Sequence, residues 1–256
     1  METNTDTLDD PVEKIKSQNK SEKKLHPWRI RPLGTHFVKA HNSQIPPSKE
    51  HPDGSVIKIQ EHCAINPSKK DILTFDEIQS MTQKYFSDLK GPPKANVLKG
   101  YSNADKFDSE IRGWVRYWND IYHFPIPLEP NLVKALIVSE SSFDPNTDIP
   151  AGNGQGHARG LMQITDETMR ILGNHHGELS DYLICFDHQK LFDPSANICA
   201  GVRWLFRTMI IAKSKLGQKA TWIDAVAIYK GVLGKKPPIK KMEIFQHHYL
   251  CIVDGC

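Results

Sequence analysis

A carboxylate at the end of an apolar helical run is the group of this chain best placed to do chemistry. Leu132, Leu136 and Glu140 are spaced by four, so they lie along one side of a predicted helix. Asp144-Pro145 ends that helix, because the residue before a proline is pushed out of the α region. Burial and the negative end of the helix dipole both disfavour a charged carboxylate. The pattern predicts that Glu140 holds a proton near neutral pH, as a general acid must, with a structural carboxylate as the alternative.

Four short sequence blocks give this glutamate a specific context. They read ESSFDP at 140–145, ARGLMQI at 158–164, DPSANI at 193–198 and IYKG at 228–231. Through these blocks the chain resembles the lytic transglycosylase SLT domain, a family related to goose-type lysozyme. The resemblance covers about residues 105–235 and does not reach the first hundred.

The resemblance implies a peptidoglycan-cleaving enzyme that acts on the β-1,4 bond between N-acetylmuramic acid and N-acetylglucosamine. In this family one glutamate protonates the glycosidic oxygen and then takes the proton of the sugar's own C6 hydroxyl, which leaves a 1,6-anhydro ring. Glu140 matches that catalytic position. No water is consumed, so the resemblance implies no second carboxylate, no cofactor and no metal. The expected partner is the peptidoglycan glycan strand.

The resemblance also implies six substrate-binding positions: Ser141, Gly160, Leu161, Met162, Gln163 and Tyr229. The Ser141 hydroxyl would order the corner after the glutamate, or serve only as a local helix-end hydroxyl. Gly160 would let the backbone approach the sugar, and the Gln163 amide would bond N-acetyl or hydroxyl groups. Met162 is interpreted as packing, while the Tyr229 hydroxyl would bond the carboxyl or the substrate.

Several departures from the family pattern bear on substrate contacts. Residues 149–152 read IPAG where the family often has Ser-Pro-x-Gly, so a serine proposed to act near the substrate is absent. Residues 153–157 look like a short insertion in the same loop. Thr165-Asp166 replaces the common Met-Pro, and Lys230 stands where an asparagine is usual. These changes concern subsite preference more than the reaction.

Hydrophobic periodicity and capping residues predict a mainly helical domain. The expected helices run from the Thr74 capping box to about 89, over 104–123, through Glu140, and over 165–173, 193–217 and 221–231. The glycine-rich stretch 144–160 predicts an irregular or β element, and residues 55–59 a short strand. The aromatic stripe of the 104–123 helix is interpreted as core. The expected fold is therefore a mainly α, lysozyme-like α+β fold with an N-terminal accessory extension.

Composition divides the chain into three segments. Residues 1–24 are polar and charged and are predicted to be disordered. Residues 25–95 are expected to be an accessory region, and 96–256 the lysozyme-like domain. The N-terminus lacks the apolar core of a signal peptide, and no apolar run reaches the roughly 18–20 residues of a membrane span.

Because the expected substrate lies outside the cytoplasmic membrane, we expect a protein made in the cytoplasm and delivered to the periplasm or cell wall by dedicated machinery. A secretion apparatus, a conjugation system or a phage holin would serve. Residues 1–95 would then be a docking region for that route, and the enzyme a cell-wall-degrading effector or wall-opening factor. An immunity protein that plugs the cleft would be expected for an injected toxin.

The chain has 256 residues, 39% hydrophobic and 25% charged, with a net charge of +3. This balance is ordinary for a soluble globular protein, and the charge is too slight to argue for nucleic acid. Its five cysteines form no CxxC pair, so free thiols are expected rather than a disulfide framework. Cys251 and Cys256 could still pair.

Three alternatives stay open. A hydrolytic muramidase would use Glu140 with Asp148 or Asp166 to position water, which needs a carboxyl separation of roughly 6.5–9.5 Å. A wall-binding module with a dead site is the second. The third is a zinc protein that would use some of the histidines, although none falls in a ligand-spacing motif. These histidines are His157, His175, His176, His188, His247 and His248.

Overall fold

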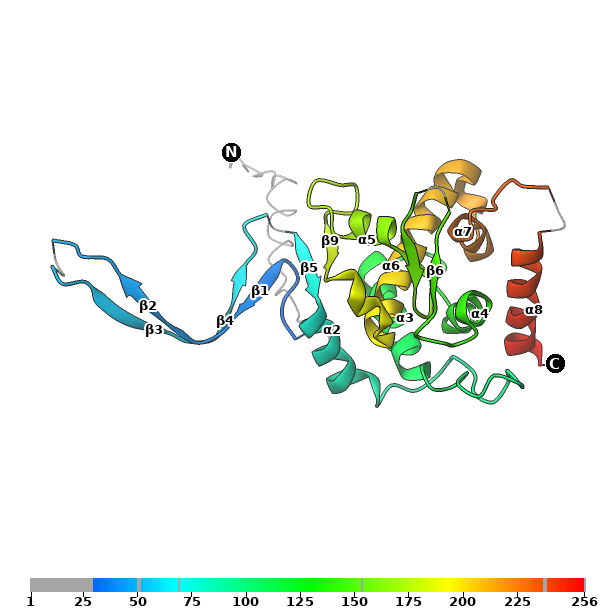
Figure 1. Cartoon of the computed structure of the whole chain (residues 1–256), viewed down its shortest axis with the longest axis horizontal. Coiled ribbons are helices and arrows are strands. Elements are labelled where there is room, and N and C mark those ends of the chain that lie inside the picture. The colour runs from blue at the N-terminus through cyan, green and yellow to red at the C-terminus, as the bar shows by residue number, and fades with distance from the viewer. Residues whose placement is uncertain (1–29, 50–51, 69, 153, 237–238, 256) are drawn as a thin grey trace, which may run out of the picture. The chain divides into compact units, whose positions relative to one another are not determined.

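A computed structural model describes residues 30–49, 52–68, 70–152, 154–236 and 239–255 (Figure 1). Contacts divide the chain into two compact units, one ending at Ile65 and the other beginning at Asn66. The segment 1–24, predicted to be disordered, lies outside the described residues.

The division between the units falls thirty residues before the predicted boundary at 95/96. Its cause is β5 (Asp71–Thr74), which pairs in parallel with β9 (Tyr182–Cys185), more than a hundred residues further along the chain. The following helix α2 (Phe75–Met81) packs on α6 (Pro194–Leu216) and buries Ile78 and Met81. Residues 66–95 therefore belong to the same compact unit as the helices.

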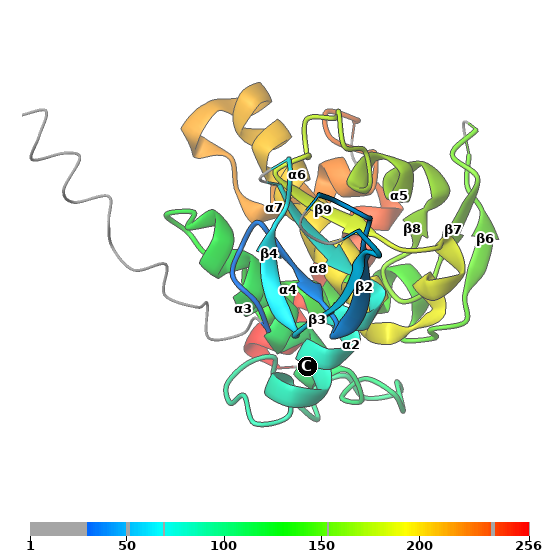
Figure 2. The same cartoon turned by 90° about the vertical axis from the view of Figure 1, so that its left-hand side faces the viewer.

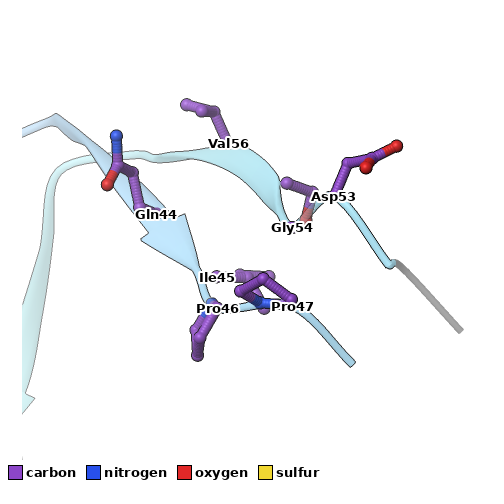
Figure 3. Close-up of a pocket in the computed structure, with 8 residues that line it drawn as sticks. Gln44, Ile45, Pro46, Pro47, Asp53, Gly54 and Val56 are labelled. Carbon is purple, nitrogen blue, oxygen red and sulfur yellow. The ribbon is translucent and has the colours of Figure 1, made fainter. Parts of the chain in front are cut away.

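The first unit consists of two antiparallel two-stranded sheets. Strand β1 (Thr35–Val38) pairs with β4 (His62–Ile65), and β2 (His41–Ile45) pairs with β3 (Ser55–Ile59). The strand predicted at 55–59 is confirmed. A pocket at the end of the second hairpin lies between Ile45-Pro46-Pro47 and residues 53–56 (Figure 3). None of the predicted site residues lines it.

The second unit is mainly helical. Besides α2 and α6, its α-helices are α3 (Asp108–Tyr122), α4 (Pro130–Ser141), α5 (Asp166–Leu172), α7 (Trp222–Tyr229) and α8 (Lys240–Asp254). Three short helices, η1 (Thr82–Phe86), η2 (His188–Phe192) and η3 (Gly217–Lys219), complete it. A three-stranded antiparallel sheet contains β6 (Asp148–Pro150), β7 (His157–Arg159) and β8 (Ile164–Thr165), seen at right in Figure 2. This arrangement is the expected mainly α fold, with the small β element after α4.

The predicted capping residues begin four of these helices. Thr74 and Thr221 each form a capping box, with Glu77 and Asp224. Thr165 accepts a hydrogen bond from the backbone of Thr168, and Asp193 accepts one from Ala196. The sequence did not predict α8, which packs against α4 (Figure 1).

The long helix α6 supplies much of the core. Ile198, Val202, Leu205 and Met209 lie along its apolar face and are buried. The aromatic stripe on α3 packs against it: the Trp114 indole donates to Ser195 Oγ at 2.8 Å, and the Trp118 indole donates to the Cys199 carbonyl at 3.2 Å. The interpretation of this stripe as core is confirmed, since Trp114 and Trp118 are both fully buried.

Cys63, Cys185 and Cys199 carry free thiols, as expected. Cys251 is disulfide-bonded, and Cys256 lies outside the described residues. Across the described ranges, no helix is both long and apolar enough to span a membrane.

A buried lysine fixes the first half of α4. Lys134 has no exposed side-chain surface, and its ammonium contacts Asp105 Oδ1 at 2.6 Å and Asp108 Oδ1 at 2.9 Å. It also donates to the Lys94 carbonyl at 2.9 Å. Burial raises the pKa of Asp108 to about 6, although contact with Lys134 opposes the shift. The cluster joins α4, α3 and the segment before α3 without any exposed cation.

The raised pKa of Asp108 predicts a pH-dependent stability. The carboxyl titrates at 3.8 when unfolded and at about 6 when folded, so the folded state binds the proton more tightly between these values. Its contribution to stability is full below pH 3.8 and is lost as the pH rises through about 6. From pH 4 to pH 7, the free energy of unfolding of wild type should fall by on the order of 1 kcal/mol relative to that of Asp108→Asn, after allowance for solvent screening. Urea unfolding at the two pH values measures this difference.

The exposed carboxyl of Asp88 gives a matched control. The Asp88→Asn variant should follow the wild-type pH dependence. A constant difference between wild type and Asp108→Asn across this range would contradict the assignment.

Candidate active site

Glu140 lies in the last turn of α4, which ends at Ser141 because Ser142 and Phe143 take left-handed backbone angles, with φ of 53° and 65°. Leu132 and Leu136, on the same side of the helix, are buried as predicted. The Glu140 side chain is 20% exposed, so the predicted buried stripe opens to solvent at its last member. A carboxylate in this position is held by the core and can still meet a ligand.

An ion pair holds that carboxylate. The Lys230 ammonium, just after α7, donates to Glu140 Oε1 at 2.6 Å. The Lys230 side chain is only 3% exposed. The sequence marked Lys230 only as a departure from the usual asparagine and did not predict this contact.

The backbone of residues 161 and 162 is fixed by one side chain from each of three helices. Ser141 Oγ donates to the Leu161 carbonyl at 2.8 Å. The Met162 amide donates to Asn197 Oδ1 at 2.7 Å, and the Tyr229 hydroxyl donates to the Met162 carbonyl at 2.6 Å. We call Ser141, Asn197 and Tyr229 the loop clamp. It links the end of α4, next to Glu140, to α6 and α7.

The role of Asn197 was missed, although the residue belongs to one of the four sequence blocks. Its side chain is fully buried and uses both ends of the amide, donating to the Arg159 and Leu191 carbonyls at 2.8 and 2.9 Å. A buried amide with this many partners fixes neighbouring backbone segments. Asn197 lies in the first turn of α6, so its helix position alone did not reveal the partners.

Gly160 is required for a different reason from the one expected. Its φ is +70°, and a Cβ there would come within 2.3 Å of both Asn197 Nδ2 and the Leu191 carbonyl oxygen. The residue is buried, so its missing side chain makes room for Asn197 rather than for a ligand.

The other predicted loop residues differ in exposure. Leu161 and Met162 have no exposed surface, and Met162 packs against Gly201 of α6. Packing was the interpretation given to Met162. Gln163 is half-buried with a left-handed φ of 51°, and its amide donates to the Gly160 carbonyl at 2.9 Å. A substrate role for these residues stays a prediction. Of the three, Gln163 is the one that is partly exposed, and its side chain is polar.

The Tyr229 hydroxyl donates its hydrogen bond to a group inside the protein. The sequence suggested a bond to the carboxyl or to substrate, whereas the structure gives the proton to the Met162 carbonyl. Burial, followed by the nearby charge of Glu140, raises the pKa of Tyr229 well above its usual value. The phenol therefore stays a neutral donor, and a bond from it to substrate stays a prediction.

The small sheet carries the carboxylates of the hydrolase alternative. The Arg159 guanidinium lies between them, with Nε at 3.6 Å from Asp148 Oδ2 and a second nitrogen in contact with Asp166. His157 Nδ1 also pairs with Asp148 Oδ1 at 2.6 Å. Burial opposes ionisation of Asp166, but hydrogen bonds from the His157 amide and from Arg159 lower its pKa. Both carboxylates are thus already engaged by the sheet.

The zinc alternative finds no site in the part of the chain that the structure describes. No group of three or more histidine, cysteine, aspartate or glutamate side chains is placed there to hold a metal ion.

Residues 126–238 match the family model of the Transglycosylase SLT domain. This range contains Glu140, the loop clamp, the small sheet and Lys230, and it leaves out the first unit and α8. No curated protein and no solved structure matches the chain. Residues 126–238 are therefore identified as a Transglycosylase SLT domain, and such a domain implies action on peptidoglycan.

The Gly160 environment predicts a severe effect of one methyl group. Gly160→Ala combines a strained left-handed backbone with overlap on Asn197 and should lower the free energy of unfolding by about 2–5 kcal/mol. Thermal and urea unfolding measure this loss. Gly152→Ala is the control, because its Cβ would meet nothing within 4 Å. Equal stabilities of the two variants would contradict the tight packing described here.

Proposed function

We propose that this protein is a lytic transglycosylase that cleaves the β-1,4 bond between N-acetylmuramic acid and N-acetylglucosamine with Glu140 as its acid and base. The observation that carries the proposal is the placement of Glu140. It is a partly exposed carboxylate at the end of a buried helix, inside the matched domain and beside the clamped loop.

In the first step the Glu140 carboxyl would give its proton to the glycosidic oxygen as the bond to the anomeric carbon breaks. The loop clamp supports this step, because Ser141 ties the residue after Glu140 to the Leu161 carbonyl. Asn197 and Tyr229 hold the adjacent Met162 backbone. A carboxyl on such a fixed frame is pre-positioned and loses little entropy on reaction.

In the second step the Glu140 carboxylate would accept the proton of the C6 hydroxyl of the muramic acid. The C6 oxygen then bonds to the anomeric carbon, and the product ends in a 1,6-anhydro ring. Glu140 is protonated again, so the cycle closes without water. One carboxyl serves both steps, so the proposed reaction needs no second carboxylate.

The hydrolase alternative requires a second carboxylate that can activate or position water. Its candidates Asp148 and Asp166 are both paired with Arg159. Hydrogen bonds from the His157 amide and from Arg159 lower the pKa of Asp166 although burial opposes this, so Asp166 is a weaker base, which favours the transglycosylase.

Product masses test the proposal. Wild-type protein digesting purified peptidoglycan should release muropeptides one water lighter than hydrolysis products, and Glu140→Gln should release none because an amide has no acidic proton to give. Glu129→Gln, an exposed change at the other end of the same helix, should retain activity. Mass spectrometry reads out all three digests.

Other outcomes would redirect the assignment. Reducing-end products would identify a muramidase, and Asp148→Asn and Asp166→Asn would then locate its second carboxylate. An inactive wild type that still sediments with peptidoglycan would identify a binding module.

Delivery by dedicated machinery through residues 1–95, and the effector role, are proposals that rest on the sequence alone. Export of a reporter fused to residues 1–95 in a cell that carries such machinery is the expected result. A fusion that is neither exported nor bound by any machine component would contradict this role.

A further inference from the structure

The strongest unexplained feature of the site is the buried cation on its acid. The Lys230 ammonium is almost without solvent, and Glu140 Oε1 at 2.6 Å is the acceptor found for it among the described residues. Desolvating an ammonium is costly unless it is paired, so this contact is strongly favoured in the free protein. The pair also affects the role proposed for Glu140. A general acid must carry a proton, whereas a nearby ammonium favours the ionised carboxylate.

We propose that Lys230 is a positioning residue whose ammonium, in contact with Glu140 Oε1, sets the pH at which Glu140 takes up the reactive proton. This rests on the proposed function of Glu140 as the acid. Protonation of Glu140, on either oxygen, removes the negative charge that pairs with the Lys230 ammonium. The fraction of enzyme carrying the reactive proton therefore falls at a lower pH than it would without Lys230.

Among the charged groups of the described residues near α4, Lys230 is the one that forms an ion pair with Glu140. Tyr229 faces Glu140 and stays neutral, so it adds no charge. On α3, Asp108 is paired with Lys134, on another part of α4. In the described part of the chain, no ion pair joins Glu140 to the other acidic, basic or histidine residues of the two helices packed on α4. These are Glu110, Arg112, Arg116 and Asp120 on α3, and Lys240, Lys241, Glu243, His247, His248 and Asp254 on α8.

The pair also lies next to the loop clamp in the sequence. Lys230 directly follows Tyr229, the α7 member of the loop clamp. One turn of chain thus fixes both the clamped loop and Glu140 Oε1. Removing the charge alone should change when Glu140 is protonated and leave the loop clamp in place.

A titration of the Glu140 carboxyl tests the proposal directly. Full-length protein labelled with carbon-13 at the glutamate carboxyls is followed by NMR from pH 3 to 9, and Glu140→Gln assigns the signal. In Lys230→Met the Glu140 midpoint should lie about one to three pH units above the wild-type midpoint, the usual effect of a charge in contact. This readout does not need activity, so it remains decisive even if the proposed function fails.

Three further variants make the result specific. Lys230→Gln removes the charge and keeps a polar side chain, which serves if Lys230→Met does not fold. Lys230→Arg keeps the charge and should leave the midpoint close to wild type. Lys235→Met removes an exposed lysine five residues further on and should have no effect. Coincident midpoints in wild type and in the folded uncharged variants would overturn the proposal.

The pH dependence of anhydro-product release gives a second readout. Its alkaline limb should move to higher pH in Lys230→Met and Lys230→Gln by the same interval as the NMR midpoint. Loss of product at every pH in both folded variants would also overturn the proposal, because an ammonium that only sets the protonated fraction is not needed for the step. An inactive wild type with the expected NMR shift would instead count against the proposed function alone.

Discussion

The site depends on three hydrogen bonds that converge on one stretch of backbone. Ser141, Asn197 and Tyr229 come from three helices far apart in the chain, and each bonds a peptide group of Leu161 or Met162. These peptide groups are buried, and leaving one of them unpaired would cost about 1–3 kcal/mol. The loop therefore has one low-energy position relative to α4, α6 and α7.

Packing around the loop also fixes its position. Gly160 and Gly201 accept neighbours that a methyl group would displace, the Asn197 amide in one case and the Met162 side chain in the other. Close-packed interiors tolerate little change in volume, so both small residues support the same geometry. Glu140 sits at the edge of this rigid region, where the buried helix meets solvent.

Two buried lysines form ion pairs at α4. Lys134 lies in its first half, and Lys230 pairs with Glu140 in its last turn. Lys134 is surrounded by two carboxylates and a carbonyl, and it has a structural role between helices. Lys230 meets the single carboxylate that is proposed to react. The same chemical pair is therefore used once for stability and once at the candidate active site, because only the second carboxylate reaches solvent.

The sequence by itself determined much of the local structure and the family resemblance from which Glu140 is proposed as the reactive residue. Proline, threonine and aspartate at helix starts act through bonds to neighbouring residues, so the starts of α5, α6 and α7 could be predicted. The order of the four blocks identified the SLT domain and the position of Glu140. Both kinds of signal are local or linear, and a single sequence retains them.

Only the tertiary structure decided which distant groups meet. The Lys230–Glu140 pair joins residues ninety positions apart, and the Asn197–Met162 bond joins residues thirty-five apart. The parallel pairing of β5 with β9 likewise moved the unit boundary to 65/66. Neither periodicity nor capping specifies such partners, because a side chain's position on its own helix says nothing about the element packed against it.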